Sequence, residues 1–384
     1  MDELKTLRDQ IDGIDKELLA LFARRMEVTR KVGEYKVRAG IQVLDAQREQ
    51  EVLDSKAALA PQAIQSEART LFETIMALSR RQQRRLVAPD QPGFSQYLAQ
   101  KAKAGEPVPD PRVLYQGVPG AYAEEAAVAY FGEACKRQNL PAWEDIFLAL
   151  ERGEADYGVV PIENSSTGSI NQVYDLLAKY EHFIVGEVKL RVCHCLLAPN
   201  RVELEDVEEV YSHEQGLFQC APYLKQHPLW KQTALSNTAA AAKFVAESGK
   251  PYAAIGSERC AKLYGLNVLA RDIAQSAENY TRFVVVAPRM ELGPERDKIS
   301  ALFTLPHKVG TLHQIMAVFA IGGLNMMKLE SRPILEKSWE YRFFVDFTGN
   351  LLDPELDLIL RELAECSTEL RVLGNYRSGE EGGA

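Results

Sequence analysis

Residues 4–35 read LKTLRDQIDGIDKELLALFARRMEVTRKVGEY, and the spacing of their apolar side chains decides the fold of the N-terminal part of the chain. Apolar residues recur every seven positions in two neighbouring rows, and Arg25 takes the place of an apolar residue in one of them. The rows are Leu4, Ile11, Leu18, Arg25 and Val32, and Leu7, Ile14, Leu21, Val28 and Tyr35. This stripe predicts one helix over residues 3–38, roughly 54 Å long.

Two further helices complete the predicted first domain, residues 1–88, which is all-α. Gly40 ends the first helix, Asp45 is a suitable N-cap for a helix over 46–59, and Pro61 opens a third helix that runs to about Leu86. An unpaired guanidinium is costly to bury. Arg25 therefore has two interpretations: a structural ion pair with a glutamate, or one wall of a pocket for an anionic ligand.

The remainder of the chain divides into a linker, two more domains and a tail. Residues 89–111 are rich in proline and glycine and predict a linker. Strands and helices alternate over 112–290, which indicates a two-lobed α/β domain with a cleft. Residues 298–376 follow the order β-α-β-β-α-β of a ferredoxin-like α+β domain. Residues 377–384 are rich in glycine and glutamate, so we expect a disordered tail.

Composition excludes several classes of function. The 384 residues carry a net charge of −9, which argues against a dedicated nucleic-acid-binding protein. No apolar run approaches the ~20 residues that a membrane span needs, and the N-terminus lacks the pattern of a signal peptide. We therefore expect a cytoplasmic protein with no nucleic-acid and no membrane partner.

The six cysteines show no paired spacing. Cys193-His194-Cys195 is their one cluster, in an alternating run over 189–197 that predicts a strand with both cysteines on one face. No further ligand stands at a recognisable spacing, which favours structural thiols in a reducing compartment over a metal site. We expect no metal and no cofactor.

Polar residues on all three N-terminal helices predict a ligand cavity. Lys36 projects near Arg25 on the helical wheel, and Asp45, Arg48 and Glu49 share one face of the second helix. Arg8 lies seventeen residues from Arg25, or ~26 Å along a straight helix. If Arg8 serves the same cavity, it must come from a partner chain, so we expect a homodimer or higher homo-oligomer.

This pattern resembles the all-helical chorismate mutases over nearly all of residues 4–86. The matching motifs are Leu7-Arg8, Arg24-Arg25, Val32-Gly33-x-x-Lys36, Asp45-x-x-Arg48-Glu49 and Ser79-x-x-x-Gln83. The resemblance implies that the substrate carboxylates are bound by Arg25, Arg48 and Arg8 of a partner chain. It implies that Lys36 and Gln83 are catalytic donors to the breaking ether oxygen, and that Asp45, Glu49 and Ser79 hold the hydroxyl and neighbouring groups. A Claisen rearrangement needs only a compact substrate and stabilisation of charge developing on oxygen.

The region 112–290 looks like a prephenate dehydratase. The motifs are Tyr115-Gln116-Gly117-x-x-Gly120-x-Tyr122, the stretch 161–168, Ser212-His213-x-Gln215, Asn237-Thr238-Ala239-Ala240 and Asn279-Tyr280-Thr281-Arg282-Phe283. The resemblance implies a catalytic Thr281, with Asn164, Gln215 and Arg282 orienting the substrate and Glu163 nearby. We expect Thr281 to stabilise the departing oxygen by a hydrogen bond, because threonine is a poor acid. The chain has Glu214 where the family usually has proline.

The region 298–376 resembles an ACT regulatory domain of the phenylalanine-regulated dehydratases. Two stretches carry this resemblance and are the implied effector-binding residues: Gly310, Thr311 and Leu312, and Glu330, Ser331, Arg332 and Pro333. The family more often has alanine where this chain has Thr311, which could alter the effector affinity. The alternative is an inert dimerisation domain.

The leading hypothesis is therefore a bifunctional chorismate mutase/prephenate dehydratase of phenylalanine biosynthesis. Chorismate and prephenate are its expected substrates, phenylpyruvate its product and L-phenylalanine its feedback inhibitor. A regulatory amino-acid-binding protein with decayed catalytic sites is the alternative from another class, and a turnover assay separates the two. The amino analogue arogenate stays open as a substrate beside prephenate.

Overall fold

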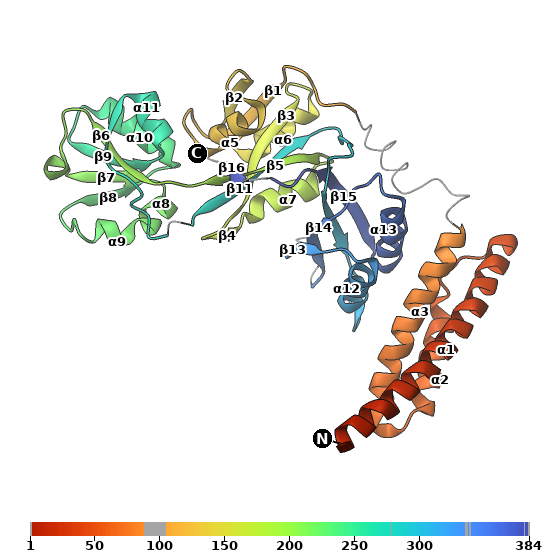
Figure 1. The fold of residues 1–384 in the computed structure, drawn as a ribbon. Helices are drawn as coiled ribbons and strands as arrows, with labels where there is room; N and C mark the ends of the chain where they lie inside the picture. Colours follow the sequence, from red (N-terminus) through yellow and green to blue (C-terminus); the bar gives the residue numbers. More distant parts are fainter. Residues whose placement is uncertain are drawn as a thin grey trace. The chain divides into compact units, whose positions relative to one another are not determined.

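The computed structural model describes residues 2–87, 105–276, 278–334, 337, 339–379 and 381–382 (Figure 1). The described residues form two compact units. The first unit holds the three N-terminal helices together with the two helices α12 and α13, and the second holds the three sheets and the other helices. Most of the predicted linker 89–111 lies outside the described residues.

The predicted three-helix succession is confirmed. The elements are α1 (Asp2–Ala39), α2 (Ala46–Leu59), a 3₁₀ turn over Gln62–Ile64 and α3 (Gln65–Val87). Gly40 ends α1 in the left-handed region, with φ of +65°. The side chain of Asp45 caps α2 by accepting from Arg48 N at 3.0 Å. The third helix begins four residues later than predicted, because the chain after Pro61 first makes the 3₁₀ turn.

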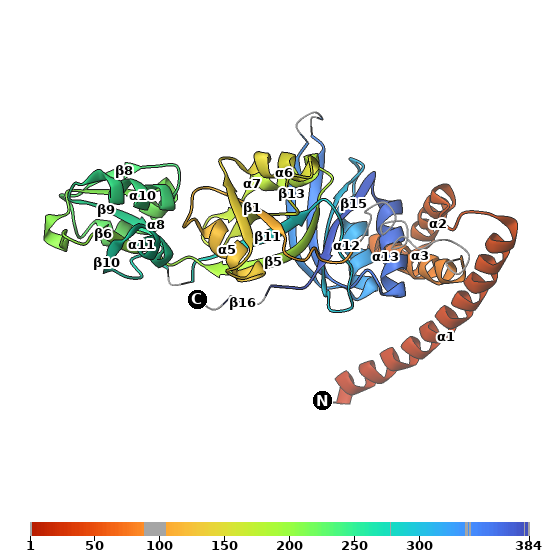
Figure 2. The same cartoon turned by 90° about the horizontal axis from the view of Figure 1, so that it is seen from above.

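One face of α1 packs on α3, and this face includes Arg25 but leaves the apolar residues of the heptad stripe exposed. Ser79 of α3 contacts both Arg25 and Met26, and a Cβ on Gly33 would come within 3.3 Å of the Gln83 backbone. The stripe itself is open to solvent in the single chain: Leu7 is 50% and Ile14 58% exposed. The long curve of α1 away from the other helices is visible in Figure 2.

The second unit contains a mixed sheet with strand order β16-β5-β11-β3-β1-β2, to which β4 pairs through β3. Its strands are β1 (Arg112–Gln116), β2 (Lys136–Leu140), β3 (Tyr157–Asn164), β4 (Gly168–Ser169), β5 (Phe183–Arg191), β11 (Tyr280–Ala287) and β16 (Glu381–Gly382), with helices α5 (Tyr122–Phe131), α6 (Trp143–Glu151) and α7 (Asn171–Lys179). Strands β1, β2 and β3 are parallel, and β11 runs antiparallel between β3 and β5. The edge strand β2 is polar and shows no alternating pattern, so it could not be predicted from the sequence.

A five-stranded sheet with order β10-β6-β9-β7-β8 forms the other lobe of this unit. Its strands are β6 (Cys195–Pro199), β7 (Glu209–Ser212), β8 (Lys231–Ala234), β9 (Tyr252–Gly256) and β10 (Leu266–Ala270), with a 3₁₀ turn at Leu204–Asp206 and helices α8 (Glu214–Gln219), α9 (Ala221–Leu224), α10 (Thr238–Ser248) and α11 (Glu258–Tyr264). The chain enters this lobe after β5 and leaves it before β11. The single strand predicted over 189–197 is therefore wrong: β5 and β6 belong to different sheets, and Cys193 and His194 lie between them.

The C-terminal segments follow the predicted order: β12 (Lys298–Thr304), α12 (Thr311–Gly322), β13 (Met326–Pro333), β14 (Tyr341–Thr348), α13 (Pro354–Cys366) and β15 (Glu369–Tyr376). The strands form a sheet of order β13-β14-β12-β15. Leu373 and Tyr376 of this sheet share a buried cluster with Ile184 and Val284 of the mixed sheet. The tail differs from the predicted disorder where Glu381–Gly382 pairs in parallel with β5.

Among the described helices, none combines the length and the hydrophobicity that crossing a bilayer requires, the 38-residue α1 included.

Two candidate active sites

A polar pocket of about 170 Å³ lies among the three N-terminal helices. We call it the helical pocket. Seven residues that the sequence predicted for one site line it together: Arg25, Lys36, Asp45, Arg48, Glu49, Ser79 and Gln83. Five further residues complete the lining and were not predicted from the sequence: Thr29, Val43, Val52, Met76 and Arg80.

Arg25 is held in this pocket by a hydroxyl instead of a carboxylate. Its Nη1 donates to Ser79 Oγ at 2.6 Å, and the Ser79 hydroxyl in turn donates to the Ile75 carbonyl at 2.7 Å. No carboxylate of the described residues lies within salt-bridge distance of Arg25, so the interpretation as a structural ion pair is wrong here. Burial lowers the pKa of the Arg25 guanidinium from its ordinary value, but that value is so high that the group stays charged at pH 7.

The other cations of the pocket are only partly balanced by carboxylates, so the pocket keeps a net positive charge. The Lys36 ammonium donates to the Val43 carbonyl at 2.6 Å, which holds it in place without neutralising it. Arg48 pairs with the exposed Glu51 at 3.2 Å, and Arg80 pairs with Glu49. A ligand with two carboxylates suits such a cavity.

Gln83 is buried, and its Oε1 has no hydrogen-bond partner among the described residues. A buried polar atom without a partner is uncommon and is typical of a site that a ligand completes. Gly33 permits this placement, because a Cβ there would lie 3.0 Å from Gln83 Cγ and 2.9 Å from Leu86 Cδ1.

Arg8 does not line the helical pocket. It lies on the exposed N-terminal half of α1, which is one unbroken helix from Asp2 to Ala39. The predicted separation of ~26 Å from Arg25 therefore stands.

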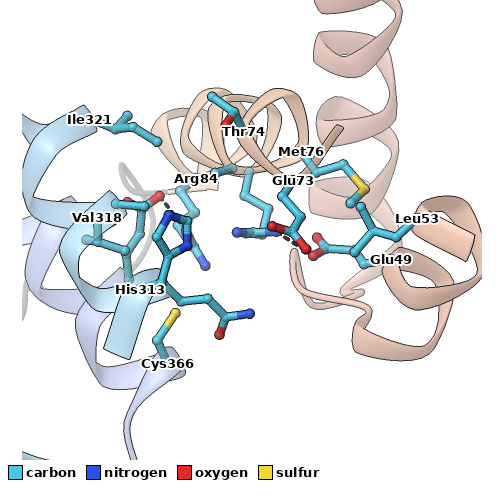
Figure 3. Close-up of a pocket in the computed structure, with 15 residues that line it drawn as sticks. Glu49, Leu53, Glu73, Thr74, Met76, Arg84, His313, Val318, Ile321 and Cys366 are labelled. Carbon is cyan, nitrogen blue, oxygen red and sulfur yellow. Dashed lines mark hydrogen bonds and ion pairs between the residues drawn. The ribbon is translucent and has the colours of Figure 1, made fainter. Parts of the chain in front are cut away.

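A second, smaller cavity of about 100 Å³ adjoins the helical pocket within the first unit (Figure 3). Glu49 and Met76 line both cavities, while His313 of α12 and Cys366 of α13 face the smaller one from the other side. The buried Arg84 of α3 forms ion pairs with Glu362 and Glu365 of α13. Ion pairs therefore connect α3, the helix that carries Ser79 and Gln83, to α13.

The second unit has a larger cleft, of about 440 Å³, between its two lobes. We call it the interlobe cleft. Of the predicted residues, Asn164, Gln215 and Thr281 line it. No Lys, Arg, Asp or Glu is among its remaining described lining residues, which are Gln116, Ala121, Tyr122, Ala123, Trp143, Pro161, Thr167, Ser169, Ile170, Val192, His194, His213, Gly216, Gln219, Ser236, Asn237, Thr238 and Phe283.

Strand register brings Asn164 and Thr281 together. The two residues are direct partners across β3 and β11, and Asn164 Nδ2 donates to Thr281 Oγ1 at 2.9 Å. The N-termini of α5 and α10 also border the cleft, with Tyr122 and Thr238 in its lining. Free backbone N–H groups at such helix starts favour anions.

His194 and Gln219 belong to the cleft, although the sequence predicted no role for either. Both are buried, and His194 Nε2 lies 2.9 Å from Gln219 Oε1. Burial lowers the pKa of the His194 imidazole, more than the hydrogen bond to Gln219 raises it, so the ring is neutral at pH 7. No local pattern could have revealed these residues, because they come from the irregular segment after β5 and the end of the short helix α8.

The predicted substrate-orienting role of Arg282 is contradicted by its position. Arg282 does not line the cleft, because neighbouring residues of a strand point to opposite faces of the sheet. Its guanidinium is buried on the far face, where Nη1 lies 2.5 Å from Asp346 and 3.2 Å from Glu187. Glu163 likewise faces away from the cleft and pairs with Lys328 at 2.9 Å. These contacts belong to the attachment of the C-terminal sheet.

The predicted effector residues fall into two groups. Gly310 caps α12 with φ of +85°, and the Thr311 hydroxyl donates to the carbonyls of Pro306 and Lys308 at 3.2 and 3.1 Å. In the second unit, Glu330 accepts from Ser169 at 2.5 Å, and Arg332 pairs with Asp175 at 2.9 Å.

Leu312 of the first group is partly exposed on α12, and Ser331 and Pro333 of the second group end β13 beside Arg332. Ser169 also lines the interlobe cleft. The strand β13 is thereby joined to one wall of that cleft.

The cysteines are free thiols, and burial raises the pKa of the Cys195 thiol. Among the described residues, no three His, Cys, Asp or Glu side chains are grouped as a metal site would need.

Two family models match the chain. One, described as prephenate dehydratase, matches residues 113–291, and the other, described as chorismate mutase type II, matches residues 7–84. A bifunctional chorismate mutase/prephenate dehydratase of Escherichia coli (strain K12) is 36% identical over 384 residues, covering 98% of this chain and 96% of that protein. An arogenate dehydratase/prephenate dehydratase 2, chloroplastic, of Arabidopsis thaliana is 42% identical and covers 69% of this chain and 72% of its own length.

A solved structure adds a likeness of fold. The prephenate dehydratase of Arthrobacter aurescens, in complex with L-Phe, is 32% identical and has a TM-score of 0.64. The likeness covers 69% of this chain and 89% of the other.

Proposed function

The chain belongs to the family of bifunctional chorismate mutase/prephenate dehydratases, and from this we propose that each of its two sites carries one of the two reactions. The helical pocket would rearrange chorismate to prephenate, and the interlobe cleft would convert prephenate to phenylpyruvate. One observation carries the assignment: seven side chains from three helices, expected together from the sequence, line one pocket. The product of the first site is then the substrate of the second.

In the helical pocket the protein's contribution is position and charge. Arg25 and Arg48 would bind the substrate carboxylates, while Asp45, Glu49 and Ser79 would hold the hydroxyl and its surroundings. The Lys36 ammonium and the Gln83 amide would donate to the ether oxygen as its bond to carbon breaks. Donors already fixed in place need no reorganisation at that moment, which is the main source of acceleration in such a reaction.

We propose that a second copy of the chain completes this pocket. Arg8 is out of reach along its own helix, and the apolar stripe around it, including Leu7 and Ile14, is exposed in the single chain. A stripe with a seven-residue repeat is typical of helices that pair along their length. Pairing would bury the stripe and could bring the partner's Arg8 to the helical pocket.

The interlobe cleft suits loss of a carboxylate. None of its described lining residues is a lysine or arginine, so the substrate carboxylates would be held by backbone N–H groups and by hydroxyls such as those of Ser236 and Thr238. A carboxylate that is desolvated without a counter-charge is less stable, and dispersal of its charge on release of CO₂ is favoured. The electron pair left behind enters the ring, expels the ring hydroxyl and makes the ring aromatic.

Thr281 would act on the departing hydroxyl. Its oxygen accepts a hydrogen bond from Asn164, so its own proton is available for donation into the cleft. Because a threonine hydroxyl is a poor acid, its role is to stabilise the negative charge on the leaving oxygen by a hydrogen bond. Phenylpyruvate, CO₂ and hydroxide are released, and the hydroxide takes a proton from the solvent to become water.

The cleft lining also favours prephenate over arogenate. Arogenate carries an ammonium where prephenate carries a ketone, and no aspartate or glutamate of the described residues lines the cleft to bind that charge. The Arabidopsis relative is named for both substrates, so a direct comparison of the two is the test.

We further propose that residues 298–376 form an ACT domain of ferredoxin-like fold and that L-phenylalanine inhibits the enzyme there. The element order and the strand order support the fold. The effector is supported by the Arthrobacter aurescens relative, which was solved with L-Phe bound. Glu330 and Arg332 contact Ser169 and Asp175 beside the cleft, which offers a route by which binding could reach the dehydratase site.

A coupled assay tests the proposal. Purified protein with chorismate alone should accumulate phenylpyruvate without added metal or nucleotide, and L-phenylalanine should slow the second step. Prephenate should be consumed faster than arogenate at equal concentration. Prephenate that accumulates without further conversion would exclude the dehydratase reaction, and absence of any turnover would favour a purely regulatory binding protein.

A further inference from the structure

We propose that Gln219 and Asn279 are positioning residues for the dehydratase reaction, because they hold the Asn164 amide nitrogen beside the Thr281 hydroxyl and thereby keep the Thr281 proton directed into the interlobe cleft. The inference rests on the proposed assignment of that reaction to the interlobe cleft. A continuous chain of hydrogen bonds links the residues: Thr281, Asn164, Asn279, Gln219 and His194.

The chain of hydrogen bonds has an unambiguous start at Asn164. Its Oδ1 accepts from the backbone N–H groups of Ser166 and Thr167 at 3.0 and 3.1 Å. A backbone N–H can only donate, so the atom facing it must be the amide oxygen. The opposite atom of Asn164 is therefore Nδ2, a donor.

Each following orientation depends on the one before. Asn164 Nδ2 donates to Thr281 Oγ1 and, at 2.8 Å, to Asn279 Oδ1. The other end of the Asn279 amide is then Nδ2, which donates to Gln219 Oε1 at 3.1 Å. That oxygen also faces His194 Nε2, so His194 must carry its proton on Nε2.

His194, the last member of the chain of hydrogen bonds, has one ring nitrogen without a proton. With its proton on Nε2, His194 has a lone pair on Nδ1, which lies 3.5 Å from the Tyr122 hydroxyl. That hydroxyl donates to the Cys193 carbonyl at 2.9 Å. The chain therefore has a fixed direction from the backbone of residues 166 and 167 to the His194 ring.

Burial makes the direction hard to reverse. Asn279 is 1%, His194 3% and Gln219 7% exposed, so water has little access to replace a lost partner. Reversing one amide would put two donors or two acceptors face to face, and a buried mismatch of this kind is unfavourable because neither group regains a partner. Removing the acceptor at position 219 would leave Asn279 Nδ2 buried without a partner, and Asn279 would no longer be held where its Oδ1 accepts from Asn164.

The catalytic consequence lies at Thr281. With Asn164 Nδ2 as the donor, the Thr281 oxygen accepts and its proton is left for the substrate oxygen. If the Asn164 amide nitrogen shifted away from Thr281, the Thr281 hydroxyl would be free to turn its proton toward another acceptor. The hydroxyl would still be in place, but it could no longer stabilise the leaving group.

The test compares Gln219→Leu with Gln226→Leu in the full chain. Gln226 is an exposed glutamine of the same lobe and serves as the matched control. We expect Gln219→Leu to lower the dehydratase kcat about 10- to 100-fold, with the KM for prephenate changed less than threefold. This is less than the roughly 100- to 1000-fold cost of removing an oxyanion donor outright, because the Thr281 hydroxyl is retained. The mutase rate should stay at the wild-type level in both variants, which reports on folding of the chain. Gln219→Glu keeps two acceptor oxygens and should retain a third or more of the wild-type kcat.

A second readout is independent of turnover. ¹⁵N NMR of histidine-labelled protein should show His194 protonated on Nε2 in the wild type, and loss of that fixed tautomer in Gln219→Leu. The proposal is overturned by an Nδ1 proton on His194 in the wild type, or by a Gln219→Leu variant with a wild-type kcat. Failure of the proposed function gives a different result: the wild type itself would not convert prephenate, while the NMR signals would still report the chain.

Discussion

Thr281 and Arg282 are consecutive residues of β11, and their side chains make contacts on opposite faces of the mixed sheet. Thr281 accepts a hydrogen bond from Asn164 in the interlobe cleft. Arg282 forms a buried ion pair with Asp346 of β14 at 2.5 Å. The strand that carries the proposed catalytic hydroxyl is thus held on its opposite face by an ion pair with the C-terminal sheet.

Removing the guanidinium should destabilise the second unit. Arg282→Leu would leave Glu187 and Asp346 buried, with Lys298 as their remaining cation. Loss of one partner from a buried ion pair typically costs about 3–5 kcal/mol. We expect the free energy of unfolding in urea to fall by that amount, whereas Arg271→Leu, at an exposed ion pair with Glu258, should change it by less than about 1 kcal/mol.

Stability in acid should depend on Asp346. Burial raises the pKa of this carboxyl, but Arg282 and Lys298 outweigh burial and hold the pKa below its ordinary value. A depressed carboxyl pKa stabilises the fold above the unfolded-state pKa of about 4, and this contribution is lost as pH falls through the folded-state pKa. Urea unfolding at a series of pH values from 7 downward should show a steeper loss below pH 4 in the wild type than in Asp346→Asn. Equal slopes would mean that the pKa of Asp346 is not lowered in the folded protein.

Arg25→Ala should abolish the mutase reaction and leave the dehydratase reaction intact. The variant removes a fixed cation that would bind a substrate carboxylate, and we expect the mutase kcat/KM to fall at least about 100-fold. Arg24→Ala, at the exposed neighbouring position, is the control and should stay within about threefold. Both rates are measured on the same protein with chorismate and prephenate. An equal loss of both activities would contradict separate sites.

Arg8→Ala and Arg25→Ala should complement each other. Each variant alone should lack mutase activity, because a pocket shared by two chains needs Arg8 from one and Arg25 from the other. Mixed and refolded together, they can form heterodimers in which one of the two pockets has both arginines. Mutase activity should then recover in part, and heterodimers verified by mass that stay inactive would argue against a shared pocket.

Gly33→Ala should weaken the contact between α1 and α3 beside Gln83. A Cβ at this position would lie 2.9 Å from Leu86 Cδ1 and 3.3 Å from the Gln83 backbone, so α3 would have to shift. We expect loss of stability by about 1–3 kcal/mol and a lower mutase kcat. Gly13→Ala is the matched control on the same helix, where a Cβ meets nothing within 4 Å. It should stabilise α1 by up to about 1 kcal/mol in thermal unfolding and leave the mutase rate unchanged.

Glu330→Ala should make the dehydratase insensitive to L-phenylalanine. Glu330 is a predicted effector residue and also accepts from Ser169 at the edge of the cleft. The variant should keep most of its activity without effector and should need at least tenfold more L-phenylalanine for half inhibition. Glu340→Ala, at an exposed ion pair with Lys337, is the control. Unchanged inhibition in Glu330→Ala would place the effector site elsewhere.

Much of both sites could be read from the sequence because the residues stand at spacings that regular elements convert into shared faces. Asp45, Arg48 and Glu49 follow a helical repeat, and all three line the helical pocket. Asn164 and Thr281 each stand in a recognisable motif, and both line the cleft. Arg282 was misassigned because it stands in the same motif as Thr281, although the two-residue period of a strand puts neighbours on opposite faces.

By itself, the sequence determined the length of α1, the order of the elements in the N-terminal and C-terminal segments, and the identity of most groups in the two sites. These depend on local periodicity and on capping residues such as Gly40 and Asp45. Tertiary structure alone decided that the Arg25 guanidinium is held by a serine hydroxyl, that Arg282 faces Asp346, and that His194 and Gln219 meet behind Thr281. The physical reason is that these contacts join segments distant in sequence, and which face of each segment is covered depends on the packing of the whole unit.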